Sequence, residues 1–250
     1  MKAIIIAAGM GARLAPLTNN KPKCMLELNG KTLLEHQIEA LKGAGVERIA
    51  LIKGYKQEMI NYPGLTYYIN DNYQDNNILH SLFYAEKEMA DDFIAVYSDI
   101  IYSKDIVSRI LENKADISAV VDLDWQASYK GRTDHPPEEA EKVIFDADNN
   151  LVKIGKILPD KNQAQAEFIG MIKCTVRGAG IFREHFNNLK DKYRGKPFQT
   201  ASVFEKAYIT DILQDLVDSG IYPRCVPIKG GWKEIDTIGD YQRLIDDNKN

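Results

Sequence analysis

Residues 3–28 read AIIIAAGMGARLAPLTNNKPKCMLEL. The apolar residues 3–7 predict a buried β-strand, and the chain then breaks into a turn that contains Gly9 and Gly11. The exposed N–H groups of such a turn form a concavity that binds phosphate, and Arg13 and Lys23 add two positive charges beside it. The stretch therefore predicts a strand followed by a binding loop for a nucleoside triphosphate.

The spacing of the two glycines disfavours other phosphate-binding motifs. A dinucleotide-binding fingerprint has a third glycine where this chain has Leu14, and it has an acidic residue about twenty positions later on a second strand. A Walker A loop needs Gly-Lys-Ser or Gly-Lys-Thr, whereas Gly11 is followed here by Ala12 and Arg13. A simple tight turn is a third alternative, but a turn alone does not need these charges or the irregular segment after them.

The same stretch resembles the signature of the nucleotidyltransferases that make sugar nucleotides and related CDP compounds. The matching positions are Ala7, Ala8, Gly9, Gly11, Arg13, Leu14, Pro16, Leu17 and Thr18, followed by Lys21, Pro22, Lys23, Met25 and Leu26. The resemblance implies that Ala7, Ala8, Gly9 and Gly11 belong to a nucleotide-binding loop. It also implies that Arg13 and Lys23 are the catalytic cations beside the reacting phosphates.

Length and composition limit the class of protein. The 250 residues suffice for one nucleotidyltransferase domain, with residues 124–175 as an acceptor-side lid and hairpin, and a net charge of −4 argues against a nucleic-acid partner. The N-terminal apolar run is too short to span a membrane and lacks the features of a signal peptide, so we expect a cytoplasmic protein. Cys24, Cys174 and Cys225 are widely spaced, which favours reduced thiols without a metal-binding pattern.

Apolar periodicity along the chain predicts alternating strands and helices. Strands are expected at residues 48–52, 65–69, 93–97, 117–123, 167–173 and 222–228, and helices at residues 32–44, 55–62, 177–193 and 203–219, from residue 78, and from residue 238. This order predicts an α/β fold with a doubly wound, Rossmann-like mixed sheet. Residues 141–146 and 151–154 predict a β-hairpin, and Gly170 predicts a bulge within its strand.

Residues 70–77 form an asparagine-rich segment between a predicted strand and a predicted helix. Such a segment lies at the carboxyl edge of the sheet, where open α/β folds bind ligands. An ordinary solvated loop is the alternative for each of its residues. In the phosphocholine cytidylyltransferase branch of the family, a similar segment lies beside the pyrimidine. The resemblance therefore implies that Asn77 and Ser81 bind the base.

Two aspartates are candidates for a Mg²⁺ site. Asp99 follows the buried strand 93–97, where a carboxylate is costly to desolvate unless a cation compensates for it, and Mg²⁺ prefers such oxygen ligands. Asp99 is a less suitable helix cap than Ser103 or Asp105. Asp236 is placed to cap the C-terminal helix, and the resemblance implies that it is the second metal-binding carboxylate. Both roles are compatible in one residue.

The acceptor site is expected around the lid and the hairpin. Trp125 and Tyr129 form either one wall of an aromatic cage for a quaternary amine or hydrophobic pins that hold the loop. Lys156, on the far arm of the hairpin, is either a solvated surface lysine or, as the resemblance implies, a ligand of the acceptor phosphate. The resemblance also places Glu167 and Gly170 beside the acceptor.

These features predict a Mg²⁺-dependent enzyme that transfers CMP from CTP to a small phosphorylated acceptor and releases pyrophosphate. Phosphocholine, aminoethylphosphonate and phosphorylated amino-acid amides are the expected acceptor types, and sugar 1-phosphate transfer is the enzymatic alternative. A catalytically silent nucleotide sensor would have lost one of the four charged residues Arg13, Lys23, Asp99 and Asp236, and all four are present. The sequence determines neither the acceptor nor whether the chain forms a homo-oligomer.

Overall fold

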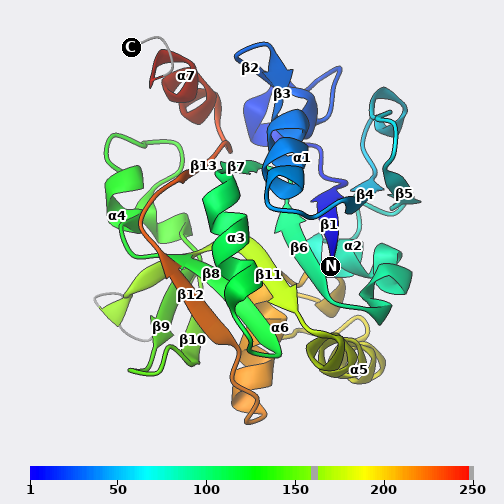
Figure 1. Ribbon diagram of the computed structural model, residues 1–250, viewed down its shortest axis with the longest axis vertical. Helices are drawn as coiled ribbons and strands as arrows, with labels where there is room; N and C mark the ends of the chain where they lie inside the picture. Colours follow the sequence, from blue (N-terminus) through cyan, green and yellow to red (C-terminus); the bar gives the residue numbers. More distant parts are fainter. Residues whose placement is uncertain (159–162, 248–250) are drawn as a thin grey trace.

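The computed structural model describes residues 1–158 and 163–247, and its centre is a nine-stranded sheet (Figure 1). The strands are β1 (Lys2–Ala7), β4 (Arg48–Lys53), β5 (Thr66–Ile69), β6 (Phe93–Tyr97), β8 (Ile117–Asp122), β9 (Lys142–Phe145), β10 (Leu151–Gly155), β11 (Ala166–Cys174) and β12 (Arg224–Ile228). Seven of them follow the order β10-β9-β11-β6-β1-β4-β5, and β8 pairs with both β11 and β12.

The sheet is mixed, as the sequence predicts. Strand β1 runs parallel to β4 and β6, β4 runs parallel to β5, and β8 runs parallel to β12, whereas β11 is antiparallel to β6, β8 and β9. Two small sheets lie outside the main one: β2 (Glu27–Leu28) pairs with β3 (Lys31–Thr32), and β7 (Ile100–Tyr102) pairs with β13 (Trp232–Glu234).

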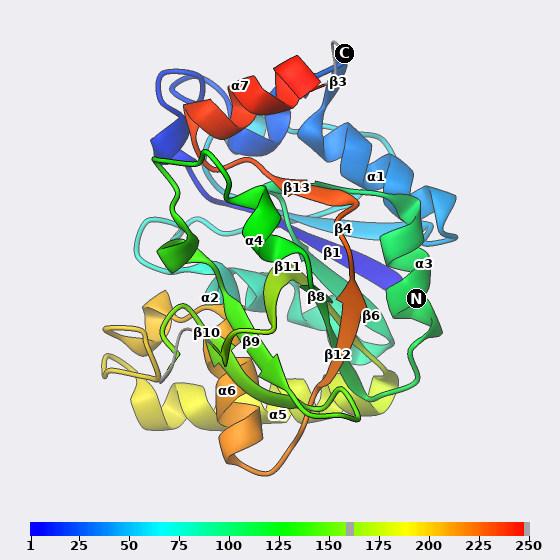
Figure 2. The same ribbon diagram turned by 90° about the vertical axis from the view of Figure 1, so that its left-hand side faces the viewer.

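Helices cover both faces of the sheet, which confirms the doubly wound fold (Figure 2). One face is covered by α1 (Leu33–Gly43) and α3 (Lys104–Glu112), and the other by α2 (Ile78–Leu82), η4 (Phe83–Ala90), α5 (Val176–Tyr193) and α6 (Ile209–Asp218). Residues 3–7 of β1 are all apolar because Ile4 and Ile6 pack on one side of the sheet while Ala3, Ile5 and Ala7 pack on the other.

Shorter helices and the C-terminal helix complete the chain. They are the 3₁₀ turns η1 (Ala12–Leu14), η2 (Lys23–Met25), η3 (Gln57–Met59), η5 (Pro137–Glu139) and η7 (Phe204–Lys206), together with α4 (Trp125–Ser128) and α7 (Ile238–Asp247). Within the described ranges, every helix is too short or too polar to cross a lipid bilayer.

Two predicted helices differ from the observed ones. Residues 55–62 contain only the short turn η3, because Lys56 adopts a left-handed backbone with φ of 49° that interrupts an α-helix. The predicted helix 203–219 is divided into η7 and α6. The buried side chain of Asp211 accepts hydrogen bonds from the N–H groups of Tyr208 (2.7 Å) and Thr200 (3.0 Å), so the α-helix begins only after Tyr208.

The predicted hairpin is formed by β9 and β10, but it belongs to the main sheet. Strand β9 pairs with β11, so the two strands of the hairpin form one edge of the path β10-β9-β11-β6-β1-β4-β5. Residues 159–162 of the predicted insertion lie outside the described ranges. The bulge at Gly170 is confirmed: the β11–β8 register shifts between Phe168 and Ile172, Gly170 has φ of 81°, and a Cβ there would lie 2.5 Å from the Tyr97 ring.

Candidate active site

The loop after β1 has two glycines with different structural roles. Gly11 has φ of 61°, and a Cβ at this position would lie 2.9 Å from Cβ of Lys23. The Thr18 hydroxyl donates a hydrogen bond of 2.9 Å to the carbonyl of Gly11 and fixes the loop. A Cβ on Gly9, by contrast, would meet no atom within 4 Å. Gly11 is thus required by the fold, whereas the surface of Gly9 is open to a ligand.

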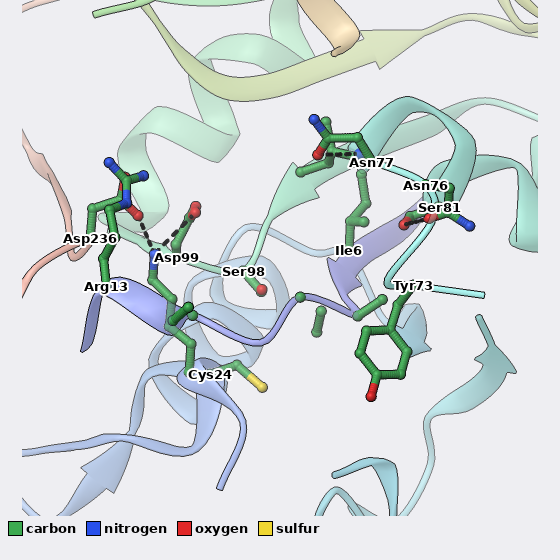
Figure 3. Close-up of a pocket in the computed structure, with 17 residues that line it drawn as sticks. Ile6, Arg13, Cys24, Tyr73, Asn76, Asn77, Ser81, Ser98, Asp99 and Asp236 are labelled. Atoms are coloured by element: carbon green, nitrogen blue, oxygen red, sulfur yellow. Dashed lines mark hydrogen bonds and ion pairs between the residues drawn. The ribbon is translucent and has the colours of Figure 1, made fainter. Parts of the chain in front are cut away.

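This loop forms one wall of a cavity of about 340 Å³, a volume within the usual range for small-molecule sites (Figure 3). The cavity is lined by all the predicted nucleotide-binding, catalytic and metal-binding residues: Ala7, Ala8, Gly9, Gly11, Arg13, Lys23, Asn77, Ser81, Asp99 and Asp236. Tyr73 and Asn76 also line it, and sequence reasoning did not single them out. We call this space the nucleotide cavity.

Four charged side chains from distant parts of the chain meet at one end of the nucleotide cavity (Figure 3). Lys23 Nζ contacts Asp236 Oδ1 and lies 3.2 Å from Asp99 Oδ2. Arg13 Nη2 donates to Asp236 Oδ2 at 2.5 Å. The loop after β1, the turn η2, the end of β6 and the segment between β13 and α7 each contribute one of them. The structure therefore brings together both predicted cations and both predicted metal-binding carboxylates.

These contacts keep the buried groups ionised. Burial alone would raise the pKa of Asp236, but Lys23, His135 and Arg13 outweigh it and hold that pKa well below its ordinary value. Burial would likewise lower the pKa of Lys23, yet the charges of Asp99 and Asp236 raise it. The cluster is therefore an alternating set of positive and negative charges at neutral pH.

The residues present fit a divalent cation. Asp99 Oδ1 is buried and makes no hydrogen bond within the described part of the chain, so a cation would satisfy it. Asp236 is not needed as a helix cap, because Thr237 and Asp240 close the first turn of α7. Thr237 Oγ1 accepts from Asp240 N at 3.2 Å, and Asp240 Oδ2 accepts from Thr237 N at 2.9 Å. The capping interpretation of Asp236 was wrong: its carboxylate faces Lys23 and Arg13 instead of the first turn of α7.

The asparagine-rich segment lies at the opposite end of the nucleotide cavity (Figure 3). Asn77 caps α2: its Oδ1 accepts from Ile78 N at 2.9 Å, and its Nδ2 donates to the Lys206 carbonyl at 3.1 Å. Ser81, one turn into α2, is buried and accepts a hydrogen bond of 2.7 Å from Asn70 Nδ2. Both residues border the cavity, and their role in reading the base remains a prediction.

A second cavity of about 250 Å³ adjoins the first one, and we call it the acceptor cavity. Five residues line both cavities: Arg13, Asn77, Ile78, Asp99 and Asp236. Three of the predicted acceptor residues line the acceptor cavity: Lys156, Glu167 and Gly170. Its further lining includes His135, Glu139, Glu141, Tyr208 and Glu234, none of which the sequence analysis identified. Glu234 precedes Asp236 by two residues, and this spacing was the one available signal.

Carboxyl groups dominate the wall of the acceptor cavity. Burial raises the pKa of Glu141 to about 8, although the residue as a whole is only half-buried. Burial and the nearby charge of Glu234 raise the pKa of Glu167 well above its ordinary value. Lys156 Nζ forms an ion pair of 2.9 Å with Glu139. A cationic ligand in this cavity would favour the ionised form of these acids.

The structure corrects the cage interpretation of Trp125 and Tyr129. Their side chains are buried, their rings meet edge to face at 5.9 Å, and they pack on Ala140. The Tyr129 hydroxyl donates to Glu167 Oε1 from behind the acceptor cavity, and neither ring is part of the lining of that cavity. These rings therefore act as hydrophobic pins, the alternative that the sequence left open.

Arg132 connects the loop that contains Trp125 and Tyr129 to the carboxylates of Glu234 and Asp240. Its side chain is 6% exposed and donates to both oxygens of Asp240 at 2.8 and 3.0 Å and to Glu234 Oε2 at 3.0 Å. The guanidinium also lies 4.8 Å from the centre of the Tyr129 ring. The hydrogen bonds to Glu234 and Asp240 fix the loop against β13 and α7, the elements that flank Asp236.

Residues 3–156 match the MobA-like NTP transferase domain. The chain belongs to this family. The CTP:phosphoglutamine cytidylyltransferase of Campylobacter jejuni is 32% identical over 98% of this chain and all of its own length. The choline-phosphate cytidylyltransferase of Streptococcus pneumoniae is 43% identical over 38% of this chain and 43% of its own length.

A solved structure extends the likeness to the whole fold. The CTP:phosphocholine cytidylyltransferase LicC of Streptococcus pneumoniae superposes with a TM-score of 0.74, over 99% of this chain and 98% of that one, at 23% sequence identity. This match confirms the mixed α/β fold that the sequence predicts.

Proposed function

We propose that this chain transfers CMP from CTP to a small phosphorylated acceptor and releases pyrophosphate. The observation that carries the proposal is that two cavities meet at Arg13, Asp99 and Asp236. A nucleotide in the first cavity and an acceptor in the second would bring their phosphates together at these charges. The names of the Campylobacter and Streptococcus relatives, which both denote cytidylyltransferases, support this reading.

The loop after β1 is suited to the triphosphate. The open surface of Gly9 leaves room for a phosphate group, and Arg13 and Lys23 supply the positive charge that balances it. Asn77 and Ser81 line the other end of the cavity, where they would contact the base. A bound nucleotide would thus extend along the cavity, with its triphosphate at one end and its base at the other.

Asp99 and Asp236 would hold Mg²⁺. When bound, the ion supplies positive charge to the phosphate oxygens and holds them in position. Lys23 contacts both carboxylates, so we propose that it turns toward the triphosphate when the ion is present. Two cations cannot share one position between the same two carboxylates without strong repulsion.

The reaction needs no nucleophile or base from the protein. An oxygen of the acceptor phosphate forms the new bond to the α-phosphorus, and the bond from that phosphorus to the bridging oxygen breaks. Pyrophosphate leaves with the electron pair of that bond. Because the acceptor phosphate is already anionic near pH 7, the contribution of the protein is to align the two substrates and to stabilise the charge with Arg13 and Lys23.

The acceptor cavity favours a particular class of acceptor. Lys156 and Arg13 provide positive charge for a phosphate, and Glu141, Glu167 and Glu234 provide carboxyl groups for an amine. An acceptor with a phosphate at one end and an amine at the other fits this distribution better than a sugar 1-phosphate. Phosphocholine and phosphorylated amino-acid amides carry a phosphate, aminoethylphosphonate carries a phosphonate, and each has a cationic nitrogen, as an ammonium or a quaternary ammonium group, at the other end.

A pyrophosphate-release screen tests the proposal. It crosses CTP, UTP, ATP and GTP with phosphocholine, aminoethylphosphonate, a phosphorylated amino-acid amide and a sugar 1-phosphate, in the presence of Mg²⁺. We expect release with CTP and one of the amine-bearing acceptors. Release only with a sugar 1-phosphate would establish the alternative enzyme, and nucleotide binding without any release would favour a nucleotide sensor.

A further inference from the structure

Asn70, directly after β5, is a fully buried amide with every hydrogen-bonding position used. Its Nδ2 donates to Asn76 Oδ1 at 2.8 Å and to Ser81 Oγ at 2.7 Å. Its Oδ1 accepts from Asn76 Nδ2 at 3.0 Å and from Asn72 N at 3.1 Å. Asn70 reaches the nucleotide cavity through Ser81 and Asn76, which both line it.

The backbone fixes the orientation of this amide. The N–H of Asn72 can only donate, so the atom of Asn70 that faces it must be the oxygen. The nitrogen of Asn70 then necessarily faces Ser81 Oγ. The same reasoning fixes Asn76, which must direct its oxygen toward the nitrogen of Asn70.

This arrangement determines the polarity of the Ser81 hydroxyl. The oxygen of Ser81 accepts a hydrogen bond from Asn70 Nδ2, so its own hydrogen points elsewhere, and Asn76 Oδ1 lies 3.3 Å away as the acceptor for it (Figure 3). A hydroxyl oxygen has two lone pairs, and one of them is left over. Because Ser81 also lines the nucleotide cavity, this lone pair is the hydrogen-bonding position that it can offer to a ligand there.

We propose that Asn70 is a positioning residue that makes Ser81 an acceptor and thereby selects cytosine over uracil. Cytosine carries an amino donor where uracil carries a carbonyl acceptor. An acceptor from the protein pairs with the amino group and repels the carbonyl. This inference rests on the proposed function, because it assumes that the base lies at the Ser81 end of the nucleotide cavity.

Nucleotide binding to the full chain tests the inference directly. The measurement is the ratio of the UTP to the CTP dissociation constant, determined for the wild type, Asn70→Leu, Ser81→Ala and the double variant. We expect the wild type to prefer CTP and each single variant to lose about five- to tenfold of this preference, the size of one hydrogen bond. The double variant should lose no more than either single variant, because both remove the same contact.

A matched control separates this role from a purely structural one. Gln214 is another buried amide, whose Oε1 accepts from Ile154 N at 3.0 Å and whose Nε2 donates to Asp218 at 2.7 Å. Gln214→Leu should lower the free energy of unfolding to a similar extent as Asn70→Leu. It should leave the ratio of the two dissociation constants unchanged.

Two results with the variants would overturn the inference while the proposed function stands: CTP binding with an unchanged ratio in Ser81→Ala, or a ratio in Asn70→Leu that stays at the wild-type value. Ser81→Ala decides the matter even where Asn70→Leu does not fold. A wild type that binds neither nucleotide and releases no pyrophosphate would overturn the proposed function and the inference together. Equal wild-type affinities for CTP and UTP would overturn the inference alone.

Discussion

Arg13 and Asp236 are 223 positions apart in the chain, and their side chains form an ion pair of 2.5 Å at the junction of the two cavities. Asp236 is mostly buried, whereas half of the Arg13 side chain is exposed. The pair links the loop after β1 to the segment that leads into α7. Both residues line both cavities, so the pair joins two distant parts of the chain at the place where the phosphates are proposed to react.

The carboxylates at the junction should be needed for turnover. Asp99→Asn and Asp236→Asn each replace a charged oxygen ligand by a neutral amide, which is a poor ligand beside phosphates. We expect pyrophosphate release to fall about 100-fold or more in each variant, with the far-ultraviolet circular dichroism spectrum unchanged. Asp105→Asn, an exposed acid in the first turn of α3, is the control and should retain activity. Near-normal turnover of Asp99→Asn at saturating Mg²⁺ would rule out this assignment.

Lys23 should limit metal binding in the absence of nucleotide. Its ammonium group contacts both Asp99 and Asp236, so an incoming divalent cation meets a positive charge at the same place. Calorimetric titration with Mn²⁺ should show tighter binding to Lys23→Met than to the wild type when CTP is absent. Lys21→Met, in the same loop, should bind Mn²⁺ as the wild type does. Equal affinities of all three proteins would contradict the prediction.

The two glycines of the loop should respond differently to substitution by alanine. Gly11→Ala places a Cβ at φ of 61° and 2.9 Å from the Lys23 side chain, and it should lower the free energy of unfolding by about 1 kcal/mol or more. Gly9→Ala meets no protein atom within 4 Å and should leave the stability unchanged while it weakens CTP binding. Chemical denaturation and nucleotide titration measure the two effects. Unaltered CTP affinity in Gly9→Ala would show that no ligand approaches this surface.

The lid should depend on Trp125 for its structure. Trp125→Ala removes a buried ring that packs on Tyr129 and Ala140, and a change of this type costs roughly 3 kcal/mol in the free energy of unfolding. The KM values for CTP and for the acceptor should rise together, because the loop that Arg132 ties to β13 loses its support. Gln126→Ala, at the exposed neighbouring position, is the control. A rise confined to the KM of an amine-bearing acceptor would restore the cage interpretation.

The free energy of unfolding should depend on pH through the ionisation of Glu141. Its pKa is about 8 in the folded chain and about 4.5 in the unfolded chain, so between these values the folded state binds more protons than the unfolded state. The contribution of Glu141 is fully present below pH 4.5 and is lost as the pH rises through 8. Glu141→Gln removes this dependence. The free energy of unfolding of the variant, minus that of the wild type, should therefore increase from pH 5 to pH 8.

Glu139→Gln is the matched control for this experiment. A hydrogen bond from Lys156 lowers the pKa of Glu139, so its contribution is lost only as the pH falls below about 4.5. The difference in stability between this variant and the wild type should therefore stay constant from pH 5 to pH 8. A constant difference for Glu141→Gln as well would contradict the prediction.

Local sequence patterns predicted most of the fold. Strand β6 begins and ends at the predicted residues, and the helix expected at residues 32–44 is α1 with Thr32 as its cap. Such elements follow from apolar periodicity and from capping residues, which act over a few positions. The division between η7 and α6 was missed because it depends on contacts of Asp211 with Thr200, a residue outside the predicted helix.

Sequence alone predicted a phosphate-binding loop after β1, from two glycines, an arginine and a lysine, and the structure brings these four residues to one cavity. The sequence did not determine which way side chains in irregular segments point. Trp125 lies in the expected segment but is directed into a small apolar cluster, and His135 and Glu234 reach the acceptor cavity from elements that the pattern does not relate. Tertiary structure decided these positions, because burial and charge pairing depend on residues that approach one another only when the sheet is assembled.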